Sequence, residues 1–471
     1  MMSWASQFVR FGSAIFVLPL ILKFFTPIEQ SFWFFINSIL GLAMLADAGF
    51  GPTMIRAVSY FNSGADYLPR NKKEYDKIEN IEAEEPNFLK LKNLLSTANK
   101  IYIYLGIFAV IMVSTGGLAA TWNILKLSGH QIDIWIAFLI VIPYCYIMIL
   151  TVKWTSFMRG LGYVAQEARF GALQGVIRIF TFVILLLFHL GPAYLVGYML
   201  FEVIIKNIYI KWFVRRWFKS KNVILENRFF FDKQIFSSLW SATWRTGLLL
   251  LGAYVIQSGT SILASQIDDA LLMANFLFTM RIIKFVVGMA RAPFYTNVPK
   301  IYRLAAKKDM TNLSRKSSEY MFLGFCVVIS AIVFIILFGN PSLELLGINT
   351  RFVSMFLLLA IAFTEILDLH SSFHATIYTS TNHVPFVLPA TISGALILLV
   401  GFKVLPVYGF FGIVAVQFII QFLFNFWYAP YLSLKLMKWP VHRYIYQLPL
   451  YGMSFIKETI KTNIFRPKKV I

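Results

Sequence analysis

Charged residues are scarce in this 471-residue chain, and acidic residues are scarcer than basic ones. Only 14% of the residues are Asp, Glu, Lys or Arg, whereas 58% are hydrophobic and the mean hydropathy is +0.68. A soluble domain of this length needs a more charged surface, so the composition excludes one. The hydrophobic residues occur in blocks of about 20, the length with which a helix crosses a ~30 Å hydrocarbon core. The sequence therefore predicts an all-α polytopic membrane protein.

Cysteine and catalytic motifs are almost missing. Cys145 and Cys326 are the only two cysteines, and both fall inside apolar blocks, where a thiol behaves as a small hydrophobe. They provide neither a disulfide framework nor a metal site. The sequence also lacks a Walker A loop, a GxSxG motif and a cluster of metal ligands. We therefore expect neither an enzyme nor a cofactor, and any driving force has to come from ions, voltage or a concentration gradient.

About twelve apolar blocks, separated by polar connectors, are predicted to span the membrane. The first block contains Arg10 and Lys23, lacks a small-residue cleavage site and leads into a second block, which indicates a span and not a signal peptide. The predicted spans are residues 4–25, 31–55, 100–122, 132–152, 171–190, 193–213, 237–262, 270–292, 319–339, 352–376, 384–402 and 409–432. We expect two six-helix lobes, residues 1–222 and 223–433, around a central cavity.

Basic residues are concentrated in every second connector. One set holds a loop over residues 56–99 and further basic segments near residues 153–169, 215–233 and 300–316, whereas the other set holds only Lys126, Arg351 and Lys403. Because basic loops remain on the cytoplasmic side, both termini are predicted to be cytoplasmic. The net charge of +21 thus reflects topology and contact with membrane lipids, and no nucleic-acid partner is expected.

The C-terminal segment, residues 434–471, is basic, aromatic and interrupted. Pro440 and Pro449 divide its short apolar stretches. We predict that this tail is amphipathic and lies on the lipid headgroups, without forming a thirteenth span.

Several basic residues are predicted to lie inside the spans. A Lys or Arg at the centre of a span costs about 2.5–3.5 kcal/mol on insertion scales, so those that are kept there usually face a cavity or a partner. In the eighth span, Arg281, Lys284, Gly288 and Arg291 share one helical face, because they are spaced by three, four and three residues. The other candidates for contact with an anion are Arg10, Arg178 and Arg245. The alternative for each is an ion pair with an interior acid or a position near the interface.

Two pairs of ionisable residues in the tenth span have alternative interpretations. Glu365 and Asp368 are three residues apart, and they either carry a coupling proton or cation or neutralise the arginines. His370 and His374 are four apart, a spacing that can bind metal. No HExxH motif accompanies them, and histidines in membranes often form hydrogen bonds between helices. We expect no metal site.

The second predicted span contains a break. The segment Asp47-Ala48-Gly49-Phe50-Gly51-Pro52 places two glycines and a proline inside an apolar block. These residues loosen a helix and free carbonyl groups that have to be satisfied by protein or water. We predict a structural hinge at Asp47, Gly49 and Gly51, in which Asp47 caps the break.

Four stretches carry a family resemblance. They are residues 45–51 (Leu-Ala-Asp-Ala-Gly-Phe-Gly), residues 157–162 (Phe-Met-Arg-Gly-Leu-Gly), Arg178 in the fifth span, and residues 405–412 (Leu-Pro-Val-Tyr-Gly-Phe-Phe-Gly). Together with the span pattern, which extends the match over most of the chain, they resemble the Wzx-like polysaccharide and O-antigen flippases. These belong to the multidrug, oligosaccharidyl-lipid and polysaccharide (MOP) exporter superfamily.

The resemblance implies a transporter of the bacterial cytoplasmic (inner) membrane that works by alternating access. Its cargo would be a lipid-linked oligosaccharide on undecaprenyl pyrophosphate, with H⁺ or Na⁺ as a counter-ion. Related lipid II flippases use cavity arginines from spans one, two and eight, which Arg10, Arg56 and Arg281 match by position.

Other classes fit the sequence less well. A multidrug exporter of the same superfamily would need acids in its cavity, and the first and eighth spans are basic. A membrane polysaccharide polymerase or ligase would need a large extracytoplasmic loop to carry its chemistry, and the predicted loops are short. A purely structural membrane protein would have no use for so many interior charges.

Overall fold

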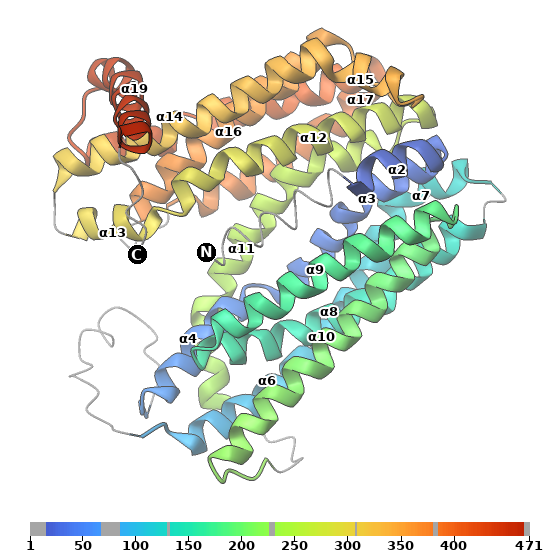
Figure 1. Cartoon of the computed structure of the whole chain (residues 1–471). Helices are drawn as coiled ribbons and strands as arrows, with labels where there is room; N and C mark the ends of the chain where they lie inside the picture. Colours follow the sequence, from blue (N-terminus) through green and yellow to red (C-terminus); the bar gives the residue numbers. More distant parts are fainter. Residues whose placement is uncertain are drawn as a thin grey trace. The chain divides into compact units, whose positions relative to one another are not determined.

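The computed structural model describes residues 16–66, 85–129, 132–225, 231–306, 309–379 and 385–465. Within these ranges the chain is helical apart from short connections, and it contains no strand (Figure 1). It divides into two compact units, Met1–Ala274 and Asn275–Ile471. The border between the two units lies after the end of α11 (Lys233–Ala264), because this helix packs against helices of the first unit. The lobe border expected at residue 222 stays a prediction.

The first unit is built around α8. Its helices are α2 (Leu18–Phe24), α3 (Pro27–Met44), α4 (Phe50–Asn62), α6 (Phe88–Met112), α7 (Leu118–Leu127), α8 (Ile132–Gly160), α9 (Val164–Leu187), α10 (Pro192–Ser220) and α11. A 3₁₀ turn, η2 (Leu45–Asp47), follows α3, and a π turn, η3 (Val113–Gly117), joins α6 to α7. The long helix α8 packs against α10, α6 and α4. It therefore carries much of the packing in this unit.

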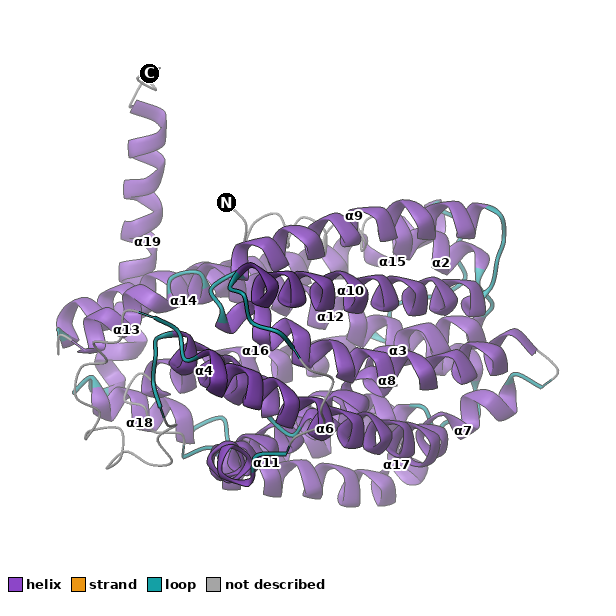
Figure 2. Cartoon of the chain, turned by 90° about the horizontal axis from the view of Figure 1, so that it is seen from below, coloured by secondary structure: helices purple, strands orange, loops and turns teal. Residues whose placement is uncertain are grey.

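The second unit begins within α12 (Ala270–Tyr295). Its other helices are α13 (Val298–Ala306), α14 (Met310–Phe334), α15 (Asn340–Leu345), α16 (Met355–Thr379), α17 (Val387–Phe424), α18 (Tyr428–Leu436) and α19 (Val441–Phe465). A π turn, η4 (Ile335–Gly339), joins α14 to α15. The helix α16 packs against α17 and α18, and α14 packs against α19. Figure 2 shows α19 lying transverse to α14 and not along it.

The all-helical, polytopic fold class is confirmed. In the described ranges, nine helical segments are long and apolar enough to cross a membrane. The apolar part of α11 is shorter, Leu250–Ala264, and the segment Val387–Leu436 counts once although Gly409 (φ 56°, ψ −145°) divides α17. The first predicted span, residues 4–25, lies mostly outside the described residues. These three segments account for the difference between nine and the twelve expected.

Helices extend into two connectors that were predicted to be loops. The helix α8 continues to Gly160, so Lys153 is a buried helical residue with 6% of its surface exposed. Its ammonium group donates to Asn99 Oδ1 at 2.6 Å and lies 4.5 Å from the centroid of the Trp154 ring. The prediction of Lys153 as a loop residue was wrong, because these two partners compensate a charge at the end of an apolar helix. Both ends of the predicted loop 56–99 are also helical, and residues 67–84 lie outside the described ranges.

Gly160 brings two helices of the first unit into backbone contact. A Cβ at this position would lie 2.5 Å from Val58 Cβ and 2.8 Å from the carbonyl oxygen of Ile55. The Ser59 hydroxyl donates to the Gly160 carbonyl at 3.1 Å. Small residues allow such close approach between membrane helices. Gly160, the first glycine of the segment Phe-Met-Arg-Gly-Leu-Gly, therefore has a packing role between α8 and α4.

We expect Gly160→Ala to destabilise the first unit by about 1–3 kcal/mol, because the added methyl group overpacks a contact made by backbone. The matched control is Gly197→Ala in α10, where an added Cβ meets no atom within 4 Å. The measurement is the thermal unfolding midpoint of the purified protein in detergent. Equal midpoints for the two variants would contradict the assigned packing.

Candidate functional site

The break in the second predicted span has the form expected from the sequence. After the 3₁₀ turn, Ala48 (φ 48°) and Gly49 (φ 82°) adopt left-handed backbone conformations, and α4 starts at Phe50. Asp47 is 5% exposed, and its Oδ2 accepts from the Gly51 backbone N–H at 2.9 Å. The aspartate therefore satisfies a backbone donor that the break leaves without a helical partner.

Two other helices hold this break in place. The Tyr102 hydroxyl of α6, fully buried, donates to Asp47 Oδ1 at 2.9 Å. In α11, a Cβ at Gly247 would lie 2.8 Å from the Ala48 carbonyl oxygen, so the two backbones touch. The interruption and the capping by Asp47 are thus present. A hinge motion at Asp47, Gly49 and Gly51 stays a prediction.

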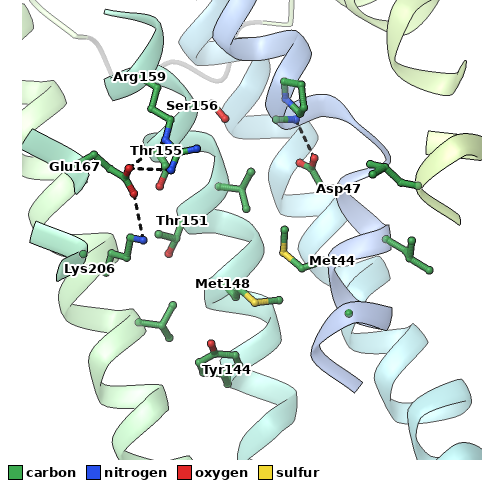
Figure 3. Close-up of a pocket in the computed structure, with 18 of the residues that line it drawn as sticks. Met44, Asp47, Tyr144, Met148, Thr151, Thr155, Ser156, Arg159, Glu167 and Lys206 are labelled. Carbon is green, nitrogen blue, oxygen red and sulfur yellow. Dashed lines mark hydrogen bonds and ion pairs between the residues drawn. The ribbon is translucent and has the colours of Figure 1, made fainter. Parts of the chain in front are cut away.

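A cavity of about 760 Å³ lies within the first unit (Figure 3). Residues of α3, α4, α8, α9, α10 and α11 line it. Its wall combines methionines such as Met44 and Met148 with hydroxyl and amide side chains such as Tyr144, Thr151 and Gln174. Such a wall offers apolar surface together with neutral hydrogen-bonding groups.

The charges on this wall are balanced. Glu167 of α9 binds Arg159 of α8 at 2.8 Å and Lys206 of α10 at 3.4 Å, as Figure 3 shows. Arg178 of α9 and Glu202 of α10 form a second pair at 3.5 Å. With Asp47, the lining contains three basic and three acidic residues. The cavity of the first unit is therefore polar with no formal net charge, and Arg178 has the acidic partner that was its alternative interpretation.

In the second unit, two basic residues of α12 meet the acids of α16. Arg291 Nη2 binds Asp368 Oδ2 at 2.9 Å, and about 30% of each side chain is exposed. Glu365 is 8% exposed; Lys284 and Arg291 attract its carboxylate, and Asp368 repels it. The structure thus brings together four predicted site residues from two helices. Asp368 neutralises Arg291, which is one of the two interpretations left open for it.

Basic residues outnumber acidic ones in this group. Arg281 lies on α12 one turn before Lys284, and it is exposed. The five predicted site residues on these two helices, Arg281, Lys284 and Arg291 with Glu365 and Asp368, have a formal charge that sums to +1. The charged residues that line the cavity of the first unit sum to zero.

The three remaining predicted cationic residues, Arg10, Arg56 and Arg245, have no described contact with either group. Arg56 is exposed on α4. Arg245 lies in α11, and its side chain is outside the described part of the structure. Arg10 also lies outside the described residues. The roles proposed for these three arginines stay predictions.

The two histidines of α16 are hydrogen-bonded to the C-terminal helices. The Tyr444 hydroxyl lies 2.7 Å from His370 Nε2 and 3.0 Å from His374 Nε2, and Ser433 lies against His374 Nδ1. Among the described residues, no group of three or more His, Cys, Asp or Glu is arranged to hold a metal ion. The hydrogen-bonding interpretation of these histidines is therefore the one that the structure supports.

Sequence reasoning missed the cluster around Glu167. Arg159 was assigned to a connector, and neither Glu167 nor Lys206 was identified as a cavity residue. The available signal was the position of Glu167 at the start of α9, directly after the Arg-Gly-Leu-Gly turn that ends α8. The two ends of such a turn lie close together.

No family model matches the sequence, and a search of curated proteins finds no match. Solved structures match the fold. The lipid II flippase MurJ aligns with a TM-score of 0.63 at 15% identity, covering 99% of this chain and 93% of that one. An inward-facing multidrug resistance transporter of the MATE family, in the MOP superfamily, aligns with a TM-score of 0.61 at 14% identity, covering 93% and 96%.

A third similar structure is a MOP superfamily transporter from Pyrococcus furiosus, described by a reverse polarity of its binding pocket. It aligns with a TM-score of 0.51 at 14% identity, covering 92% of this chain and 93% of that one. The chain has the fold of MOP transporters. At these identities the likeness establishes the fold alone, and each of the three structures is named as a flippase or transporter, which is consistent with a non-enzymatic protein.

We expect Tyr102→Phe to lower the free energy of unfolding by about 1–3 kcal/mol, because it leaves a buried Asp47 oxygen without its donor. The matched control is Tyr104→Phe on the same helix, whose side chain is 64% exposed and for which we expect a change below about 0.5 kcal/mol. Denaturation in detergent, followed by intrinsic fluorescence, measures both. The support of Asp47 by the Tyr102 hydroxyl is wrong if both variants unfold like the parent.

Proposed function

We propose that this protein is a Wzx-like flippase that moves an undecaprenyl-pyrophosphate-linked oligosaccharide, an O-antigen or polysaccharide repeat unit, across a bacterial cytoplasmic membrane. The observation that carries the proposal is the row of basic residues on α12, where Arg281, Lys284 and Arg291 share one helical face and the last two lie beside Glu365 and Asp368 of α16. Family resemblance supplies the identity of the cargo, and the fold shared with MurJ is consistent with it.

The chemistry of such a cargo matches the distribution of charge. Its prenyl tail can remain in lipid, whereas its pyrophosphate and sugars have to pass through a medium that rejects them. Guanidinium and ammonium groups bind phosphate oxygens through charge-assisted hydrogen bonds, and guanidinium does so bidentately. Arg281 and Lys284 are the residues for which we propose this role, with Arg10, Arg56, Arg178, Arg245 and Arg291 as further contributors. Rocking of the two lobes would then expose the cargo to the opposite leaflet.

The cavity of the first unit suits the uncharged part of such a cargo. Its formal charge is balanced, and hydroxyl and amide groups such as Thr151 and Gln174 line it. Sugars are recognised by hydrogen bonds of this kind together with apolar surface. We therefore propose that this cavity accepts saccharide and that Arg178, through its pair with Glu202, helps to orient that contact.

A multidrug exporter is the alternative that a specific observation favours. Three acids and several methionines line the cavity of the first unit, which is a suitable surface for an apolar cation. A MATE-family transporter also shares the fold. The two functions differ in their need for the cations on α12, because a cationic drug gains nothing from Arg281 or Lys284.

We expect Arg281→Ala and Lys284→Ala each to reduce flipping of a pyrophosphate-linked oligosaccharide by 10- to 100-fold. A hydrogen bond to a charged group contributes roughly 1.5–3 kcal/mol, and a factor of ten corresponds to about 1.4 kcal/mol. Translocation is measured in proteoliposomes. The control is Lys403→Ala, an exposed cation of the same unit. Unchanged transport in both α12 variants would refute the assignment, and export of a cationic drug by all three would favour the alternative function.

A charge-pair rescue distinguishes neutralisation from ion coupling in α16. If Asp368 serves only to neutralise Arg291, Asp368→Asn lowers the thermal unfolding midpoint and Arg291→Gln in the same protein restores it. Glu365→Gln is expected to retain cargo binding and to abolish stimulation by an imposed proton or Na⁺ gradient. Transport by Glu365→Gln that still responds fully to both gradients would exclude this residue as the coupling group.

A further inference from the structure

The C-terminal helix α19 has one face fixed against the second unit. Tyr444 is 8% exposed, and the ring of Phe455 lies 6.3 Å from that of Tyr320 in α14. Gly452 permits close packing, because a Cβ at this position would overlap the Phe322 ring. These residues share one side of the helix. That side is the packed face of α19.

Polar contacts determine the rotation of α19 about its own axis. The Tyr444 hydroxyl is hydrogen-bonded to both His370 and His374 of α16, at 2.7 and 3.0 Å. The Trp439 ring packs edge-on against Tyr444 with centroids 5.3 Å apart, and its Nε1 donates to Gln447 at 2.9 Å. Burial in this cluster raises the pKa of the Tyr444 phenol, so the hydroxyl keeps its proton. The orientation of the opposite face is therefore also set.

The opposite face of α19 is apolar in its middle and basic at its ends. Tyr446, Leu450 and Met453 are spaced by four and three residues and are 69%, 47% and 49% exposed. Arg443 precedes this stripe by three residues and Lys457 follows it by four, and both are exposed. Neither basic side chain forms an ion pair with a described residue. Single exposed apolar residues are ordinary, but a stripe of three between two cations is the pattern of an interfacial helix.

We propose that this stripe, Tyr446, Leu450 and Met453 with Arg443 and Lys457, inserts into the anionic headgroup layer of the membrane. The direction of α19 fits this occupant, since the helix lies transverse to α14, a membrane-crossing helix against which it packs (Figure 2). A helix that lies in the interface has this direction, buries its apolar side among acyl chains and places its cations at lipid phosphates. The inference does not depend on the identity of the cargo.

A second consequence concerns α16. Because Tyr444 links α19 to His370 and His374, the lipid-bound helix is connected to the element that carries Glu365 and Asp368. The stripe therefore anchors the second unit at the membrane surface through a defined polar contact. An attachment through a flexible tail would not transmit this restraint.

Fluorescence quenching in nanodiscs tests the proposal on the full chain. Single cysteines are introduced at Leu450 and, as an exposed control after α10, at Lys221, in a Cys145→Ala/Cys326→Ala background. Each is labelled with an environment-sensitive probe and exposed to a lipid-borne shallow quencher or to aqueous iodide. We expect the probe at position 450 to be quenched at least twofold more by the lipid quencher than the control, and to be protected from iodide. A probe at Met453 repeats the test if the first variant fails to fold.

The lipid requirement is tested by changing the anionic phosphatidylglycerol content. Lipid quenching at position 450 should increase with phosphatidylglycerol, and Arg443→Gln/Lys457→Gln should remove at least half of that increase. Iodide quenching equal to that of the control would show that the face lies in water and overturn the proposal. Protection from both quenchers would overturn it as well, because a protein surface would then cover the stripe.

Discussion

The compensation of charge inside an apolar chain is the constraint on which this structure depends. An uncompensated cation in a membrane-crossing helix costs several kcal/mol, so each has to find an acid, an aromatic ring, an amide or water. The first unit meets this demand locally. Glu167 and Glu202 hold the three cations of the cavity wall, and Lys153 uses Asn99 and Trp154. In the second unit, Asp368 binds Arg291, and Glu319 binds Arg315 and Lys316.

The break at Asp47 follows the same principle, applied to backbone groups. A helix that is interrupted within a membrane protein leaves donors and acceptors that lipid cannot satisfy. Asp47 accepts from the Gly51 N–H, and Tyr102 in turn satisfies the aspartate. Gly247 also brings the backbone of α11 into contact with Ala48 in the break. Residues from three parts of the chain thus maintain one irregular turn, which explains why a carboxylate is kept at this buried position.

Much of the helical framework was predictable from the sequence, because span length and the glycine-proline break are local signals. The positions of α9, α10 and α12 agree with their predicted spans to within several residues at each end. The partners of ionisable residues were not predictable in the same way. The contacts of Lys153 with Asn99 and of Glu167 with Lys206 join different helices, and helical periodicity does not say which faces meet. The contacts of Tyr444 with His370 and His374 of α16 were not predictable either, because they depend on where the C-terminal helix packs.

The Tyr444 hydroxyl requires different tautomers of its two histidine neighbours, His370 and His374. A phenol hydroxyl has one proton, so it can donate to only one of the two imidazole nitrogens beside it, and the other nitrogen must carry the hydrogen. Ser433 uses its proton on the Pro430 carbonyl at 3.0 Å, which leaves His374 Nδ1 as the donor to Ser433 and His374 Nε2 as the acceptor from Tyr444. His370 must then be the Nε2–H tautomer. The hydrogen bonds thus form a chain with a single direction, from His370 through Tyr444, His374 and Ser433 to Pro430. A shift of tautomer at either histidine therefore disturbs every later bond in this chain.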